Sequence, residues 1–123
     1  MAKRILDHAS VRIGNLERAR AFYEGLLGLE RAARPDLGVR GEWYTLGQGQ
    51  LHLIEGRSSG ANEGAIDPTD RHFAIEVDDL NAMRQQLKTA GIEMLDFGGP
   101  QLWVRDPDGN TVELRAPGDR FPK

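Results

Sequence analysis

The 123-residue sequence contains no cysteine, which excludes a disulfide framework, a thiolate metal site and a cysteine nucleophile. It has no apolar run near the roughly 20 residues that a membrane-spanning helix needs, and charged residues occur too early for a signal peptide. It also has no excess of positive charge, because 16 Lys and Arg against 19 Asp and Glu give a net charge of −3. Nucleic-acid binding needs a basic face. We therefore expect a cytoplasmic protein with neither a membrane nor a nucleic-acid partner.

The predicted secondary structure repeats within the chain. Residues 5–13 and 71–77 are predicted strands, and each precedes an amphipathic helix that ends at a glycine, Gly28 or Gly91. Each helix is followed by three more predicted strands: 29–33, 41–46 and 51–55 in the first half, and 92–97, 101–105 and 111–115 in the second. The order strand–helix–strand–strand–strand, written twice, predicts an α+β fold of two βαβββ modules.

Turn residues and helix caps delimit these modules. Asn15 in the first half, and Asp78 or Asp79 in the second, can accept hydrogen bonds from the first free amides of the helices. Between the halves, residues 56–70 are rich in turn-forming residues, which is typical of a linker. We predict a first module at 1–55, a linker at 56–70 and a second module at 71–123, which together form one domain.

Strand alternation separates apolar from polar rows, because successive side chains point to opposite faces of a sheet. Rows such as Ala9, Val11 and Ile13 form the predicted core against the helices. The opposite rows hold all three histidines, His8, His52 and His72, together with Glu113. They also hold Arg12, Arg115 and Glu76, for which we prefer the interpretation of solvated surface charges.

Two predicted hairpins add aromatic residues to the same rows. A turn at Gln48 and Gly49 would pair Thr45 with His52 and Trp43 with Ile54. A three-residue loop between Asp106 and Asn110 would place Trp103 opposite Glu113. A slip of one residue in either register would move these side chains to the other face. Tyr44, by the same register, belongs to the core row.

The histidines and Glu113 occupy matching places in the two halves. His8 and His72 lie 64 residues apart, and His52 and Glu113 lie 61 apart, as 72 − 8 and 113 − 52 show. If the halves are related by a pseudo-two-fold axis and curve into a cup, all four side chains converge. Imidazole and carboxylate groups at one point predict a divalent transition-metal site. Taken singly, each has an ordinary alternative as a polar residue on a strand face.

Four motifs of the chain are Leu6-Asp7-His8-Ala9-Ser10-Val11, Ala21-Phe22-Tyr23-Glu24-Gly25-Leu26-Leu27-Gly28-Leu29, His72-Phe73-Ala74-Ile75-Glu76-Val77 and Val104-Arg105-Asp106-Pro107-Asp108-Gly109-Asn110-Thr111-Val112-Glu113-Leu114. With these motifs the chain resembles the vicinal oxygen chelate superfamily, which includes glyoxalase I, bleomycin-resistance proteins, fosfomycin-resistance thiol transferases and extradiol dioxygenases. The resemblance implies that paired βαβββ modules form a curved mixed sheet that closes into a metal-binding cup, usually within a homodimer. It implies His8, His72 and Glu113 as metal ligands.

The fourth ligand position departs from glyoxalase I, which has Glu where this chain has His52. Strict glyoxalase I chemistry is therefore not expected. A lyase, an isomerase or an extradiol-type dioxygenase fits a site with two His and one Glu. We expect one divalent ion per site (Fe, Mn, Ni or Zn), with His52 as a fourth ligand or an acid–base group and Glu113 as a second proton-transfer group.

A small-molecule substrate is expected to chelate the metal through adjacent oxygens. Trp43 and Trp103 would contact it on two sides, or else simply pack, while Ser10 and Thr45 would donate hydrogen bonds. Arg12 or Arg115 could attract an anionic substrate. The alternative is a non-catalytic protein that sequesters an antibiotic in the same cup. Such a protein needs no metal, whereas all four positions here carry metal-competent side chains.

Overall fold

The computed structural model describes residues 2–57 and 64–118. The chain forms two compact units, residues 1–61 and 62–123. Part of the predicted linker, 58–63, and the end of the predicted second module, 119–123, lie outside the described residues. The module limits drawn from the sequence therefore stay a prediction.

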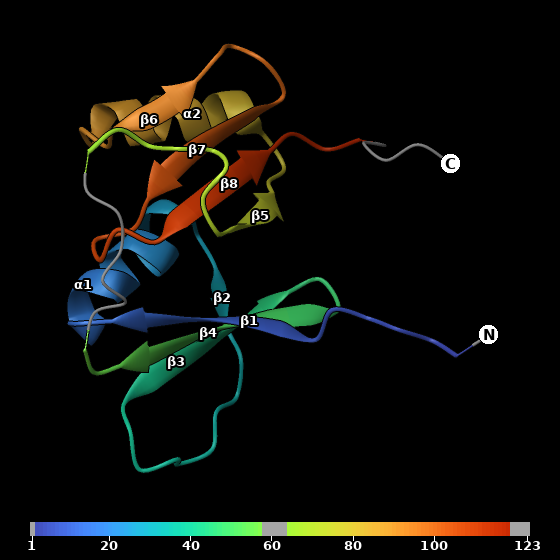
Figure 1. Ribbon diagram of the computed structural model, residues 1–123, viewed down its shortest axis with the longest axis vertical. Coiled ribbons are helices and arrows are strands. Elements are labelled where there is room, and N and C mark those ends of the chain that lie inside the picture. Colours follow the sequence, from blue (N-terminus) through green and yellow to red (C-terminus); the bar gives the residue numbers. More distant parts are fainter. Residues whose placement is uncertain (1, 58–63, 119–123) are drawn as a thin grey trace. The chain divides into compact units, whose positions relative to one another are not determined.

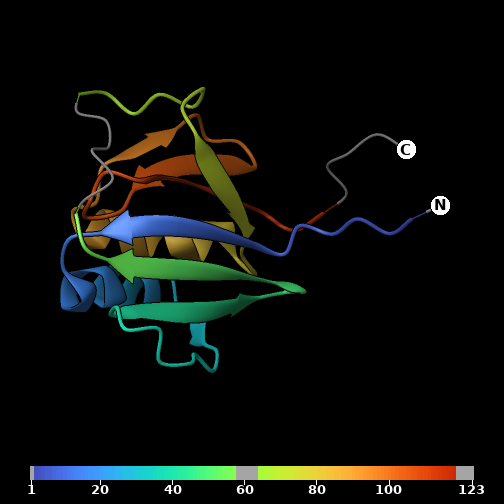
Figure 2. The same ribbon diagram turned by 60° about the horizontal axis from the view of Figure 1, so that its bottom comes forward.

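The first unit contains a four-stranded mixed sheet in the order β1-β4-β3-β2 (Figure 1). β1 pairs with β4 in parallel, and the other neighbours are antiparallel. Figure 2 shows β1, β4 and β3 side by side. The elements are β1 (His8–Ile13), α1 (Leu16–Arg20), η1 (Ala21–Leu26), β2 (Glu30–Arg31), β3 (Gly41–Leu46) and β4 (Gly49–Glu55).

The second unit repeats this arrangement with the strand order β5-β8-β7-β6. β5 and β8 are parallel, as β1 and β4 are in the first unit. The α+β class with two βαβββ modules is therefore confirmed. The elements are β5 (His72–Glu76), α2 (Leu80–Thr89), β6 (Met94–Asp96), β7 (Gln101–Arg105) and β8 (Thr111–Arg115).

The predicted helix ends are confirmed, and the choice between two caps is decided. Asn15 Oδ1 accepts from Arg18 N at 2.8 Å. Asp79 Oδ1, and not Asp78, caps α2 by accepting from Ala82 N at 2.9 Å. Gly28 and Gly91 follow the two helical segments with φ of 70° and 74°, the left-handed conformation that glycine adopts without strain.

The first helix and the first strand differ from the prediction. The helix expected to run uniformly to Leu27 changes at Ala21 into the π-helix η1, in which Leu27 N donates to Phe22 O at 3.0 Å. A 3.6-residue apolar period cannot reveal this wider turn, because the buried side chains keep similar spacing. The strand predicted from residue 5 begins only at His8, and Ile5 is half-exposed.

The core of each unit lies on the apolar rows, as predicted. Ile13, Leu51 and Leu53 are fully buried in the first unit, and Leu114 and Val112 in the second. Tyr44 is also fully buried, while its hydroxyl donates to a carboxylate oxygen of η1. The opposite rows are left to carry the candidate site. No helix of the described chain is long and apolar enough to cross a membrane.

Candidate functional site

The hairpin of the first unit has a different register from the predicted one. The turn lies at Gly47 and Gln48, so that Trp43 pairs with His52 and Thr45 with Gln50. Gly47 has a φ of 58°, and glycine at the first central position is characteristic of a type II′ turn. Each β3 residue is paired two positions earlier on β4 than predicted. Because a shift of two preserves the face, Trp43 and Thr45 remain on the face of His52.

Three aromatic rings stack on this face. The ring centroids of His8 and His52 are 4.3 Å apart, with planes 20° from parallel. The ring of Trp43 stacks on His52 at 4.1 Å and 7°. Ser10 of β1 is the register partner of His52 on β4. His8 lies two positions before Ser10 on the same face of β1, so its imidazole is diagonally next to that of His52. One face of Trp43 is therefore already covered by His52, and the stack restricts the orientation of the imidazole.

Hydrogen bonds define which ring nitrogen of each histidine carries a proton. Asp7 Oδ2 lies 2.8 Å from His8 Nδ1, so Nδ1–H donates to this carboxylate and Nε2 is the ring nitrogen left for another partner. Gln50 Oε1 lies 2.8 Å from His52 Nε2, so His52 has the opposite arrangement and keeps a lone pair on Nδ1. Partners that fix the tautomer in this way are characteristic of metal-binding histidines.

The surroundings of His52 disfavour its protonated form. Burial lowers the pKa of its imidazole, and the nearby His8 and Arg34 lower it further, against an opposing effect of Asp7. A lone pair on Nδ1 is therefore present at neutral pH. Such a nitrogen can bind a metal ion or accept a proton.

The second unit brings an imidazole and a carboxylate together. His72 Nε2 lies 3.0 Å from Glu113 Oε1, and their side chains are 24% and 9% exposed. β8 presents Glu113 beside β5, where Ala74 is its register partner. Trp103 lies opposite Glu113 on β7, as predicted. The predicted loop is also present, with Asp106 N donating to Asn110 O at 2.9 Å.

The donor chemistry of His72 and Glu113 fits a cation. His72 Nδ1 lies 2.7 Å from the backbone oxygen of Asp70, which can only accept, so Nδ1 carries a proton. Nε2 then faces the carboxylate oxygen of Glu113. A contact between these two atoms needs a proton or a cation between them, and a metal ion bound by both atoms would supply it. Imidazole nitrogen and carboxylate oxygen are common ligands of divalent transition metals.

Arg115 does not behave as the solvated rim charge that we preferred from the sequence. Its Nη1 donates to Glu113 Oε2 at 2.5 Å, and its side chain is 22% exposed. The two residues lie on one face of β8 because they are two positions apart. Both oxygens of Glu113 therefore have partners: Oε1 contacts His72 and Oε2 contacts Arg115. The carboxylate is held in one orientation.

The predicted substrate-binding residues lie on the same faces as these pairs. Ser10 and Thr45 are exposed on the first sheet. Trp103 is 8% exposed on the second, and its indole Nε1 is buried without a hydrogen-bond partner among the described residues. The exposed ring of Phe97 approaches Trp103 edge-on, with centroids 6.2 Å apart. Contact of Ser10, Thr45 and Trp103 with a substrate stays a prediction.

Within its described residues, neither unit gathers three or more metal-competent side chains. Each contributes one pair: His8 with His52, and His72 with Glu113. The sequence had paired these residues differently, as repeat equivalents. Three supporting groups were missed: Asp7, Gln50 and the Asp70 carbonyl. Alternation could have revealed Gln50, which lies two positions before His52, whereas a backbone carbonyl leaves no signal in the residue type.

The fold and these pairs define a class of protein: a duplicated βαβββ scaffold with imidazole and carboxylate groups on equivalent strands. The family model of the Glyoxalase/Bleomycin resistance protein/Dioxygenase superfamily matches residues 5–114. The chain belongs to this superfamily.

Several relatives are enzymes. The chain is 31% identical to the ethylmalonyl-CoA/methylmalonyl-CoA epimerase of Cereibacter sphaeroides, over 93% of this chain and 89% of the relative. It is 26% identical to a lactoylglutathione lyase of Neisseria meningitidis, over 89% and 88%. A glyoxalase-family structure from Bacillus anthracis has a TM-score of 0.72 at 28% identity, covering 94% and 98%. The fosfomycin resistance protein FosX of Mesorhizobium loti shares the fold, with a TM-score of 0.69 at 18% identity, covering 93% and 92%.

Proposed function

We propose that this chain is a metal-dependent lyase or isomerase that moves a proton on a carbon next to a carbonyl group of a small molecule. The observation that carries the proposal is the contact of His72 Nε2 with Glu113 Oε1, in which the other ring nitrogen is held by the Asp70 carbonyl. The names of the relatives support it, because one is an epimerase and another a lyase.

In this proposal His8, His72 and Glu113 bind one divalent ion, and His52 is either a fourth ligand or an acid–base group. His8 and His72 would bind through Nε2, since hydrogen bonds occupy their Nδ1 atoms. When bound, such an ion would polarise the carbonyl group of a chelating substrate and make the adjacent C–H more acidic. Its identity among Fe, Mn, Ni and Zn would indicate the type of reaction.

His52 is the better candidate for the proton-transfer base. Its Nδ1 lone pair is present at neutral pH, because burial and the neighbouring charges lower its pKa. Glu113, the other candidate, already contacts His72 and Arg115 with its two oxygens. We therefore assign ligand binding to Glu113 first, with proton transfer as a role that requires it to leave one of these partners.

The remaining predicted residues would orient the substrate. Trp103 offers an indole N–H beside Glu113 that the described residues leave without an acceptor, and an oxygen atom of the substrate would satisfy it. Trp43 would contact the substrate with its outer face, since the inner face stacks on His52. Ser10 and Thr45 would donate hydrogen bonds from the first sheet.

Elemental analysis of untagged protein tests the metal site. We expect about one transition metal ion per site in the wild type. His8→Ala and Glu113→Ala should lose it, whereas Glu76→Ala, which removes a carboxylate from another strand position, should retain it. A wild type that binds no Fe, Mn, Ni or Zn after reconstitution would contradict the proposal and favour the non-catalytic, antibiotic-binding alternative.

Solvent exchange tests the reaction. Methylmalonyl-CoA and lactoylglutathione, taken from the names of the relatives, are incubated with metal-loaded protein in deuterium oxide, and deuterium next to the carbonyl is measured by mass spectrometry. His52→Gln should abolish exchange while retaining the metal if His52 is the base, and should lose the metal if it is a ligand. Oxygen consumption with a catechol, without any exchange, would instead indicate a dioxygenase.

A mixing experiment tests the proposed homodimer and where its sites form. His8→Ala and Glu113→Ala chains are unfolded together, refolded and assayed for bound metal. If one site combines the His8 pair of one chain with the Glu113 pair of its partner, a mixed dimer has one intact site and regains metal. If each site lies within one chain, no metal returns. Sedimentation of the wild type determines the oligomeric state independently.

A further inference from the structure

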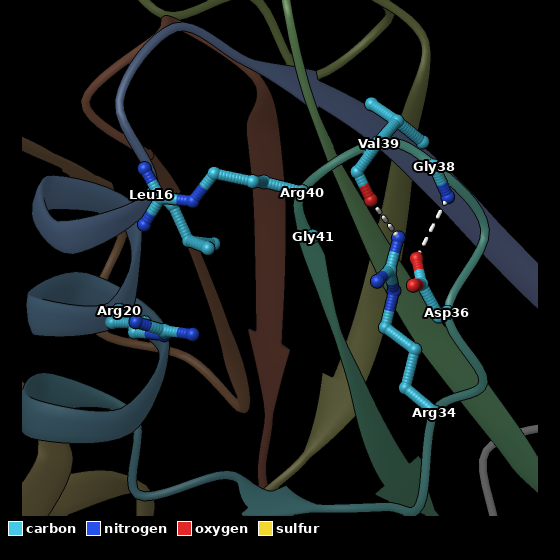
Figure 3. Close-up of a pocket in the computed structure, with 8 residues that line it drawn as sticks. All are labelled: Leu16, Arg20, Arg34, Asp36, Gly38, Val39, Arg40 and Gly41. Atoms are coloured by element: carbon cyan, nitrogen blue, oxygen red, sulfur yellow. Dashed lines mark hydrogen bonds between the residues drawn. The ribbon is translucent and has the colours of Figure 1, made fainter.

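The first unit contains a cavity of about 440 Å³ beside the start of α1 (Figure 3). We call it the arginine pocket, because Arg20, Arg34 and Arg40 all line it, together with Asp36 and Gly41. Arg20 comes from the helix, and the other two arginines come from the segment between β2 and β3. Figure 3 shows Arg40 extending toward the helix and Arg34 lying beneath Val39. Three guanidinium groups around one cavity suggest an anionic occupant.

Two of these arginines already have acidic partners. Arg20 Nη2 lies 2.9 Å from Glu42 Oε1, and Arg40 Nη2 lies 2.5 Å from Glu17 Oε1. A guanidinium has five N–H donors, so each can still support a ligand, but its charge is balanced. Asp36 is the acidic residue that lines the pocket. Its Oδ1 accepts a hydrogen bond from Gly38 N at 3.0 Å, within the turn that Asp36 begins.

Arg34 differs from both. Among residues 2–57 and 64–118 it forms no ion pair with a carboxylate, and Nη2 donates only to the backbone oxygen of Val39, at 2.7 Å. Its Nε is buried and has no hydrogen-bond partner within the described part of the chain. A partly buried cation without a counter-charge is unfavourable unless a ligand supplies one. The fold therefore leaves this guanidinium incompletely satisfied.

The location of Arg34 connects the pocket to the candidate site. A Cβ atom on Gly41 would lie 3.0 Å from Arg34 Nη2, so the guanidinium packs against the bare backbone of β3. Gly41 and Trp43 face the same side of the sheet, about 7 Å apart along the strand. Trp43 in turn stacks on His52.

The equivalent place in the second unit lacks this feature. A cavity at the start of α2 is lined by Asp78 and Asp79. Arg84, which lies 64 residues after Arg20, is saturated by Asp96 through Nε at 2.6 Å and Nη2 at 3.2 Å, and by the carbonyl of Gly99. At this place the second unit therefore holds a guanidinium that Asp96 balances, whereas the first unit holds Arg34.

We propose that the arginine pocket binds an oxyanion, a carboxylate or a phosphate, on the substrate that reacts at His52, with Arg34 as the specificity-determining contact. The substrate class is thus a small molecule with a charged group a few bonds away from its chelating oxygens. This inference rests on the proposed function for its link to catalysis, whereas anion binding itself can be measured without metal or turnover.

Titration of the metal-free protein tests the pocket. Inorganic phosphate and acetate are added separately at constant low ionic strength, and amide chemical shifts are followed by NMR. We expect saturable shifts centred on residues 34–41 with at least one anion. Arg34→Gln should weaken that binding about tenfold or more, while Arg57→Gln, which removes the same charge from an exposed position of the same unit, should not. Phosphate binding alone indicates a phosphate ester, and acetate binding alone a carboxylate.

Either of two results would overturn the inference: equal affinity in Arg34→Gln and the wild type, or shifts centred outside residues 34–41. Arg34→Lys separates recognition of the anion from packing. It keeps the positive charge that Arg34→Gln removes but lacks the planar guanidinium group, so its affinity should lie between those of Arg34→Gln and the wild type. With any substrate that shows exchange, Arg34→Gln should raise KM by a larger factor than it changes kcat. Failure of metal binding would leave the titration valid, so failure of the pocket and failure of the proposed function are distinguishable.

Discussion

The two units have the same strand order but carry different side chains at equivalent positions. In the first, two imidazoles stack, with centroids 4.3 Å apart. In the second, the equivalent strands hold an imidazole 3.0 Å from a carboxylate. In both, a tryptophan lies opposite the last-strand residue: Trp43 faces His52, and Trp103 faces Glu113. Backbone register therefore sets which positions meet, while the residue type sets whether they interact as stacked rings or as opposite charges.

The helices show the same contrast between position and partner. Arg20 and Arg84 occupy equivalent helical positions, and each reaches a carboxylate on its own sheet. Arg20 contacts the buried Glu42, which Arg31 also approaches at 3.4 Å. Arg84 donates hydrogen bonds from two nitrogens to the two carboxylate oxygens of Asp96. One unit thus shares its charges among several residues, while the other uses a single bidentate pair.

The largest difference between the units should appear at Gly41. A Cβ there would lie 2.2 Å from the carbonyl oxygen of Leu53, a backbone atom that cannot move aside. Gly41→Ala should therefore lower the free energy of unfolding by about 3 kcal/mol. At the corresponding place of the second hairpin stands Gln101, and Gln101→Ala should change it by less than about 1 kcal/mol. Urea denaturation measures both; similar values would show that β3 can shift to accept the methyl group.

The arginine pairs should give the next largest effect. Arg84→Met removes both hydrogen bonds of Asp96 to this side chain and should destabilise the protein by about 2 kcal/mol. Arg20→Met should cost about 1 kcal/mol, because Arg31 remains close to Glu42. Thermal and urea unfolding report the two values. The reverse order would mean that the buried Glu42 depends on Arg20 more than its two-partner geometry indicates.

A smaller effect should distinguish the two kinds of histidine support. Asp7→Asn weakens the acceptor that holds His8 Nδ1, and because Asp7 is 93% exposed we expect metal affinity to fall only about threefold, below the usual range for buried partners. Asp70→Asn is the matched control, since His72 bonds to the backbone oxygen of Asp70. Competition with a chelator measures both affinities. An equal loss in both variants would indicate a general charge effect.

The sequence predicted the fold well, because its signals are local and occur twice. Apolar periodicity, the caps Asn15 and Asp79, and the glycines after each helix identified the elements and their order. It missed the π-helix η1, since an extra residue in one turn barely changes the apolar period. It misplaced one hairpin turn, because Gly47 and Gly49 flank Gln48 and either could occupy a turn position; the φ of 58° at Gly47 decides the register.

The site was predicted as positions and not as interactions. Alternation placed the histidines and Glu113 on the faces away from the core, and the structure brings His8 to His52 and His72 to Glu113. Whether one metal joins the two pairs stays a prediction. The contact of Arg115 with Glu113 escaped prediction, because two residues on one strand face can equally point to solvent. Arg34 lies in a loop whose path has no periodic signal, so its place near His52 could not be predicted.

The smallest effect should appear in the pH dependence of stability, and it concerns the Arg84–Asp96 pair. Hydrogen bonds from Arg84 lower the pKa of Asp96 despite an opposing effect of burial. Because the folded state has the lower pKa, the unfolded chain binds the proton more readily, and the pair stabilises the fold fully only above the ordinary carboxyl pKa. That contribution is lost as the pH falls through the folded pKa.

The difference in unfolding free energy between wild type and Arg84→Met should therefore shrink from pH 6 to pH 3. The difference between wild type and Arg71→Met, which changes an exposed arginine, should stay nearly constant. A difference for Arg84→Met that does not vary with pH would show that Arg84 acts through packing and its carbonyl contact, and not through the charge of Asp96.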